Sequence, residues 1–165
     1  MSGKTFNRLM IVLALVLIVV IWFDDRGLPD EVSGRAKTID GDSLVVGGEE
    51  IRLVGIDAPE ARQMCERNGR EWACGREAAR RLRGVIARRS VTCEIEDIDK
   101  HDRLLAVCSV GDVELNRWMV ENGWAVAYGR YRDEERMAEN QRRGIWQGQF
   151  ERPRDWRDRD RAKTG

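Results

Sequence analysis

The chain has 165 residues, which allows one folded domain with a short anchor or tail, at about 100 to 200 residues per domain. Its 42% hydrophobic and 35% charged residues exclude collagen-like and low-complexity classes and predict a folded domain. The 29 basic residues balance the 29 acidic ones, so no overall basic field can attract nucleic acid, and any polyanion site must be local.

The first predicted element is a membrane-directed segment from Leu9 to Phe23, an apolar run without a charge. Its length lies within the range of a signal-peptide core and just below the roughly 20 residues of a membrane span. No small-x-small cleavage signal follows, so we expect an uncleaved anchor over residues 1–24, with secretion after cleavage or a buried core helix as alternatives. Lys4 and Arg8 before the segment, and Asp24 and Asp25 after it, place the rest of the chain on the outer side.

Short β-prone runs follow a linker over residues 25–34. We expect strands at Arg35 to Ile39, Ser43 to Val46 and Glu50 to Val54. Gly47 and Gly48 predict a hairpin between the last two strands, because glycine pairs supply the positive φ angles of tight turns. Residues 55–75 are rich in polar side chains and are expected to form a long loop.

Three helices are expected in the second half of the chain, at Gly75 to Arg88, Leu115 to Glu121 and Asp133 to Arg143. In the first, apolar residues recur at helical spacing while arginines occupy the other positions. Such an arginine face is more often solvated than bound to nucleic acid. The charge-dense tail, residues 147–165, is expected to be irregular.

Four cysteines form an even set in a chain that is predicted to be exported, which favours disulfide bonds. A hairpin turning at Lys100 and His101 places Cys93 opposite Cys108 and gathers the apolar residues of both strands on one face. A cross-strand disulfide follows, and the remaining pair is Cys65 with Cys74. A four-thiolate zinc site is the alternative, although the spacings lack the C-x2-C knuckles of such sites.

The order of elements predicts an α+β fold that is mainly β. Five strands with a helix after the third suggest a five-stranded Greek-key barrel of the OB type, with about three helices, over residues 35–146. The barrel is preceded by the predicted membrane helix.

Several charged residues are unusual in position for a barrel that has no functional site. Asp42 lies in a glycine turn between strands, Arg52 lies within a strand, and Asp57 and Glu60 follow at its exit. Two carboxylates at adjacent strand ends supply hard oxygen ligands for Ca²⁺ or Mg²⁺. Each acid alone also has a structural explanation, as a turn cap, a residue before a proline turn or a solvated side chain.

Together, the motifs closely resemble the staphylococcal nuclease family. The resemblance covers about residues 35–146 and rests on four runs: IDGDSLVVGGEEIRLVGIDAPE from Ile39 to Glu60, DKHDRLLAV from Asp99 to Val107, ENGWAVAY and RRGIW. It implies an OB-fold, calcium-dependent phosphodiesterase that acts on DNA and RNA.

The resemblance also implies roles for single residues. Asp42 and Asp57 would be carboxylate ligands of Ca²⁺, with the backbone carbonyl of Ala58 as a third ligand. Glu60 would be the general base or would orient the attacking water, a role worth roughly 10² to 10⁴ in rate.

Two arginines and three further residues would contact the substrate. Arg52 and Arg103 would bind phosphate, because a guanidinium can donate two parallel hydrogen bonds to phosphate oxygens as charge builds up on them. Lys100, His101 and Tyr128 would contact the rest of the substrate.

The chain departs from the family pattern at three positions. Ser43 stands where threonine is usual and keeps the hydroxyl, and His101 replaces a frequent tyrosine. Asp102 replaces the usual glycine before Arg103. We expect its carboxylate to attract the Arg103 guanidinium and weaken phosphate binding.

The sequence therefore predicts a membrane-anchored or exported Ca²⁺-dependent nuclease with DNA or RNA as substrate. No protein partner is implied, and a monomer is expected. The alternative is an OB module that binds nucleic acid or another ligand without turnover. Three acids beside two phosphate-facing arginines favour the nuclease, because carboxylates without a metal ion repel a phosphate.

Overall fold

The computed structural model describes residues 28–164. The predicted membrane anchor, residues 1–24, lies outside the described residues. Within residues 28–164, no helix combines the length and apolar character needed to cross a membrane.

Five strands close into a barrel, as the sequence predicts. β1 (Glu31–Thr38), β2 (Ser43–Val46) and β3 (Glu49–Leu53) follow one another antiparallel. β8 (Leu104–Val110) pairs parallel with β3 and antiparallel with β7 (Ser90–Ile98), and β7 closes the ring by pairing with β1. The short β9 (Val113–Glu114) adds to the edge of β8. This closed, mainly β architecture fits the OB fold.

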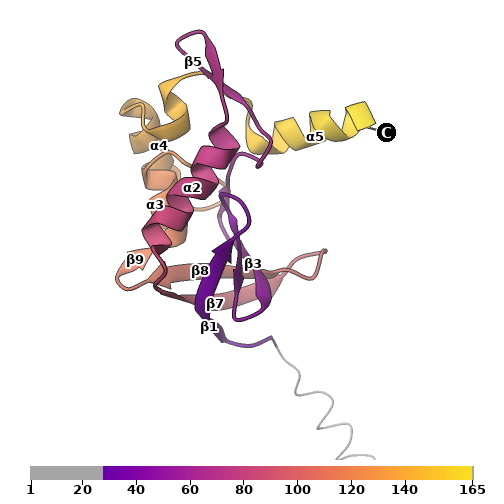
Figure 1. The fold of residues 1–165 in the computed structure, drawn as a ribbon, viewed down its shortest axis with the longest axis vertical. Helices are drawn as coiled ribbons and strands as arrows, with labels where there is room; N and C mark the ends of the chain where they lie inside the picture. The colour runs from indigo at the N-terminus through magenta and orange to yellow at the C-terminus, as the bar shows by residue number, and fades with distance from the viewer. Residues whose placement is uncertain (1–27, 165) are drawn as a thin grey trace, which may run out of the picture.

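Alternate residues of the strands fill the barrel interior, as period-two side-chain direction requires. In β8 every second residue from Leu104 to Val110 is buried. α2 (Cys74–Ile86) packs its buried Ala78, Leu82 and Ile86 onto the same core. Figure 1 shows the strands β1, β7 and β8 in the lower part of the view and the helices in the upper part.

The first strand begins earlier than predicted, at Glu31 rather than Arg35. Residues 31–34 were assigned to the linker, but Glu31 to Arg35 pair with Glu94 to Ser90 of β7. This pairing spans about sixty positions of the chain and leaves no local sequence signal. The folded domain therefore starts inside the predicted linker.

The three predicted helices are present. α2 and α3 (Leu115–Glu121) match their predicted ranges closely, whereas α4 (Arg132–Asn140) ends before the predicted Arg143. Arg142 and Gly144 both have positive φ, at 50° and 54°, which ends a right-handed helix. A short 3-10 helix, η1 (Gly144–Gln147), follows.

The charged tail is helical, so the prediction of an irregular tail is wrong. α5 (Pro153–Thr164) begins with Pro153, has Asp155 in its first turn, and has Arg161 and Lys163 in its last turn. A proline at the first position and this order of charges are typical of a helix, because the helix dipole favours acids at the start and bases at the end. The high charge density masked these signals.

The predicted long loop contains a hairpin, which corrects that prediction. β5 (Cys65–Arg67) and β6 (Arg70–Trp72) pair around Asn68 and Gly69, whose φ angles are 53° and 70°. An Asn-Gly pair is a strong hairpin signal that the sequence contained. Upstream, β4 (Ile56–Asp57) pairs with β10 (Val126–Ala127).

Both predicted disulfides are confirmed, since Cys65 is bonded to Cys74 and Cys93 to Cys108. The predicted hairpin register is also confirmed, with Cys93 opposite Cys108 and Ile95 opposite Ala106. A bulge between Ile95 and Asp97 then shifts the pairing towards the turn. No cysteine is free, so a four-thiolate zinc site is excluded.

Candidate active site

Two buried carboxylates meet at one arginine. Asp42 directly precedes β2, Asp57 lies in β4, and each residue is 4% exposed. Nη2 of Arg52, in β3, donates to Asp42 Oδ2 at 3.2 Å and to Asp57 Oδ1 at 3.1 Å. The structure thus brings together three residues that the sequence singled out.

The turn before β2 holds Asp42 in place. Its backbone N–H donates to Asp40 Oδ1 at 3.0 Å, and Ser43 Oγ donates to Asp42 Oδ1 at 3.1 Å. The Ala58 N–H donates to Asp42 Oδ2 at 3.0 Å. Gly41 permits this close approach, because a Cβ there would lie 2.6 Å from the Cβ of Ala58. The hydroxyl at position 43 therefore orients Asp42.

Burial raises the pKa of Asp42 to about 7, against the opposing charge of Arg52, and Asp40 and Asp57 add to the rise. The Arg52 guanidinium does not offset the burial of Asp42, and a divalent cation would supply further positive charge. Within residues 28–164, no three His, Cys, Asp or Glu side chains are grouped to hold a metal ion. Asp42 and Asp57 supply two carboxylates, and a hard cation such as Ca²⁺ held by them would need carbonyl and water oxygens as further ligands.

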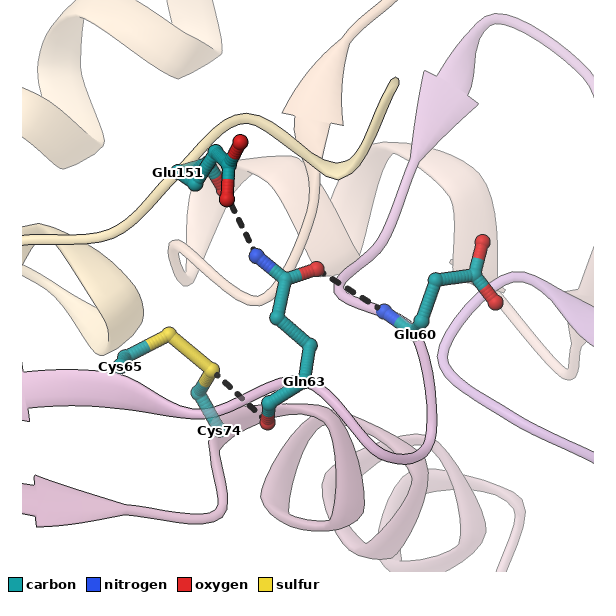
Figure 2. The surroundings of a disulfide bond; sticks show 5 residues. All are labelled: Glu60, Gln63, Cys65, Cys74 and Glu151. Carbon is teal, nitrogen blue, oxygen red and sulfur yellow. Dashed lines mark hydrogen bonds between the residues drawn. A yellow bond between two sulfur atoms is a disulfide. The ribbon is translucent and has the colours of Figure 1, made fainter. Parts of the chain in front are cut away.

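The Glu60 loop is held by a buried glutamine. Gln63, which is 0% exposed, accepts the Glu60 N–H at Oε1 (3.2 Å) and donates from Nε2 to the Glu151 carbonyl oxygen at 2.7 Å. Its own carbonyl oxygen lies 3.4 Å from Sγ of Cys74, in the Cys65–Cys74 disulfide. Figure 2 shows Gln63 between Glu60 and Glu151, with the Glu60 carboxylate directed away from the disulfide.

The start of α2 also contacts the Glu60 loop closely. A Cβ on Gly75 would lie 1.7 Å from the Glu60 carbonyl oxygen, so only glycine fits there. The disulfide, the glutamine and this glycine together fix the backbone of Glu60. The side chain of Glu60 remains partly exposed, at 29%.

The second predicted phosphate ligand, Arg103, is bound by an acid other than the one we expected. Its Nε and Nη2 donate to Asp99 Oδ2 at 2.9 and 2.7 Å. Asp102 has φ of 61°, the left-handed conformation that favours glycine or aspartate, and forms the turn at which Asp99 accepts the Arg103 N–H. The expected competitor for the guanidinium is therefore Asp99, in place of Asp102.

The predicted substrate residues line one open cavity of about 830 Å³. Its walls include Arg52, Asp57, Glu60, Lys100, His101, Arg103 and Tyr128. Tyr128 is 62% exposed, and its N–H donates to the Gly55 carbonyl oxygen at 2.8 Å, which fixes it beside β4. Asp42 and Ala58 are buried beneath this surface.

Arg157, in α5, belongs to the site although the sequence did not predict it. Its guanidinium donates to Asp57 Oδ1 at 2.8 Å, to Asp57 Oδ2 at 3.0 Å and to Glu60 Oε1 at 2.8 Å. Burial opposes the charge of Arg157, but the hydrogen bonds to Asp57 and Glu60 outweigh it and raise the pKa of the guanidinium. The tail contains several arginines and acids, and nothing in the sequence distinguishes Arg157 from the other arginines.

Comparison with known proteins identifies related sequences. A model of the family described as "Staphylococcal nuclease homologue" matches residues 50–148. The chain is 33% identical to the succinoglycan biosynthesis protein ExoI of Rhizobium meliloti (strain 1021), over 82% of this chain and 75% of that protein. It is 29% identical to an uncharacterized endonuclease of Escherichia coli O157:H7, over 80% of this chain and 86% of that protein. It is 31% identical to the probable staphylococcal-like nuclease CAN4 of Oryza sativa subsp. japonica, over 81% of this chain but 27% of that protein.

Proposed function

The chain belongs to the staphylococcal nuclease family, and we propose that it is a calcium-dependent nuclease that hydrolyses phosphodiester bonds of DNA, RNA or both. The observation that carries the proposal is the meeting of buried Asp42 and Asp57 at Arg52, on a cavity that also presents Glu60 and Arg103. Family membership and the endonuclease-named relative support hydrolysis of nucleic acid.

Asp42, Asp57 and the carbonyl oxygen of Ala58 would hold the cation, which would polarise a phosphoryl oxygen and offset developing negative charge. The raised pKa of Asp42 supports a divalent cation, because a carboxyl buried beside other acids is stabilised as an anion by added positive charge.

The other residues act on the phosphate and on water. Arg52 and Arg103 would donate hydrogen bonds to phosphate oxygens, and these bonds strengthen as charge builds up in the transition state. Glu60 would accept a proton from the attacking water, since its carboxylate lies at the cavity and its backbone is fixed by Gln63. Lys100, His101 and Tyr128 would contact neighbouring parts of the nucleic acid.

We also propose that the nuclease domain lies on the outer side of a membrane, tethered by residues 1–24. Two disulfides support an oxidising compartment, where such bonds persist. Secretion after cleavage of the anchor would place the domain in the same compartment. Because no protein partner is implied, the active form is proposed to be a monomer.

One assay distinguishes the proposed nuclease from the alternative, an OB module that binds nucleic acid without cleaving it. The purified full chain is incubated with supercoiled plasmid and with single-stranded RNA in Ca²⁺, beside the Asp133→Ala variant, whose changed residue is exposed on α4. We expect both proteins to cleave one or both substrates. Binding of the nucleic acids with no cleavage in any Ca²⁺ concentration would favour the binding module.

A further inference from the structure

The C-terminal helix α5 places a cationic group on the acids of the proposed site. Arg157 donates to both carboxylate oxygens of Asp57, and its Nη1 bridges Asp57 Oδ1 and Glu60 Oε1, at 2.8 Å from each. Asp57 Oδ1 also accepts from Arg52, so this oxygen already has two hydrogen bonds. A cation that approached Asp57 would therefore have to share or displace these donors.

Charge leads to the same conclusion. When all five side chains are ionised, the carboxylates of Asp42, Asp57 and Glu60 and the two guanidinium groups together have a net charge of about −1, which attracts a divalent cation weakly. Removing Arg157 from this cluster leaves about −2, which matches the charge of Ca²⁺. Arg157 thus neutralises the negative charge that a cation needs.

The helix that carries Arg157 is tied to the Glu60 loop. The Glu151 carbonyl oxygen, just before α5, accepts a hydrogen bond from the buried Gln63 at 2.7 Å. Arg62, in the same loop as Gln63, binds Asp160 at 3.0 Å near the end of α5. The loop thus contacts the segment just before α5 and the second half of the helix, and these contacts position Arg157.

We propose that α5 is an autoinhibitory element in which Arg157 competes with the catalytic cation for Asp57 and also holds Glu60. The inference rests on the proposed function, because it assumes that Asp57 binds the cation. Arg157 donates to both acids in the structure, and a cation would bind Asp57 as the guanidinium leaves. The apparent Kd for the cation is then the intrinsic Kd divided by the fraction of molecules in which Arg157 has released the acids.

The test is calorimetric titration of Ca²⁺ into the full chain without substrate. In Arg157→Ala we expect the Kd for Ca²⁺ to fall by about five- to tenfold, as expected for loss of a partly buried competing ion pair. Arg154→Ala is the matched control, because Arg154 lies on the same helix and lines the same cavity. It should change the Kd by less than about twofold, since exposed charges are screened.

A second variant tests the helix itself. Arg62→Ala removes an exposed anchor of α5 and leaves Arg157 in place, so it should lower the Kd in the same direction by a smaller factor. It keeps the test valid if Arg157→Ala proves unstable, which thermal unfolding without Ca²⁺ would reveal.

The outcomes distinguish failure of the competition by Arg157 from failure of the proposed calcium-dependent function. An unchanged Kd in both Arg157→Ala and Arg62→Ala overturns the competition while the proposed nuclease stands. An equal fall in Arg157→Ala and Arg154→Ala also overturns it, because general charge would then explain the effect. Absence of Ca²⁺ binding in all forms overturns both the competition and the proposed calcium dependence.

Discussion

Arg103 donates through Nε and Nη2 to a single oxygen of Asp99, Oδ2, at 2.9 and 2.7 Å. Burial alone would raise the pKa of Asp99, but hydrogen bonds from the Arg103 guanidinium and from the backbone N–H groups of His101 and Arg103 lower it to about 2. The acid thus fixes the turn between β7 and β8 and also holds the guanidinium that is proposed to bind phosphate.

The first prediction concerns the pH dependence of this pair. An aspartate whose pKa is lowered in the folded state stabilises the fold above its unfolded pKa of about 4, and this contribution disappears as the pH falls towards 2. Asp99→Asn should therefore lower the free energy of unfolding by about 1 kcal/mol at pH 6, discounted for partial exposure, and by much less at pH 2. Urea unfolding at both pH values measures this. A difference that stayed constant with pH would show that the charge of Asp99 is unimportant.

Asp102 has a different role from the one its position beside Arg103 suggested. Its φ of 61° is the conformation in which glycine is unstrained, and it is not the acid that binds Arg103. Asp102→Gly should leave kcat/KM within about twofold, because an exposed charge contributes little. The melting temperature should stay the same or rise slightly. A several-fold rise in activity at low salt would instead show that Asp102 competes with phosphate for Arg103, as the sequence suggested.

Glu60 should act in the chemical step rather than in binding. Glu60→Gln keeps the size of the side chain and removes the proton acceptor, so kcat should fall by about 10² or more while KM changes by less than about threefold. Glu71→Gln, on the exposed β6, is the matched control and should behave as the wild type. An unchanged kcat in Glu60→Gln would assign the proton transfer to another group.

Two glycines of α2 form a natural pair for testing how the Glu60 loop is positioned. A Cβ on Gly75 would lie 1.7 Å from the Glu60 carbonyl oxygen, whereas a Cβ on Gly84 meets nothing within 4 Å. Gly75→Ala should lower both stability and kcat, because the helix and the loop must separate. Gly84→Ala should raise the free energy of unfolding by about 0.5 to 1 kcal/mol, with activity unchanged. Equal effects of the two substitutions on kcat would contradict the role of Gly75.

Local patterns predicted much of the fold. The hairpin register followed from the apolar alternation around Cys93 and Cys108, and the structure confirms the resulting disulfide. The range of α3 was correct because its apolar spacing is local. By contrast, the start of β1 depends on pairing with β7, far along the chain, which no local pattern reports.

The same distinction applies to the site. One short motif contains Asp42, Arg52 and Asp57, so the sequence predicted that they act together, and the structure places them in contact. Asp57 and Arg157 are separated by 100 positions, and the arginine is one of many in a charged helix. The contact of Arg157 with Asp57 could be recognised only in three dimensions. The same holds for Asp99, which binds Arg103 where the sequence suggested Asp102.

The buried carboxylates are proposed to act through a cation, and plasmid cleavage by the full chain before and after chelation tests this directly. We expect cleavage in Ca²⁺, loss of at least about 10²-fold in rate with EGTA, recovery when Ca²⁺ is restored, and no recovery in Asp57→Ala. A chelated wild-type protein that cleaved as fast as the Ca²⁺-loaded one would contradict the account.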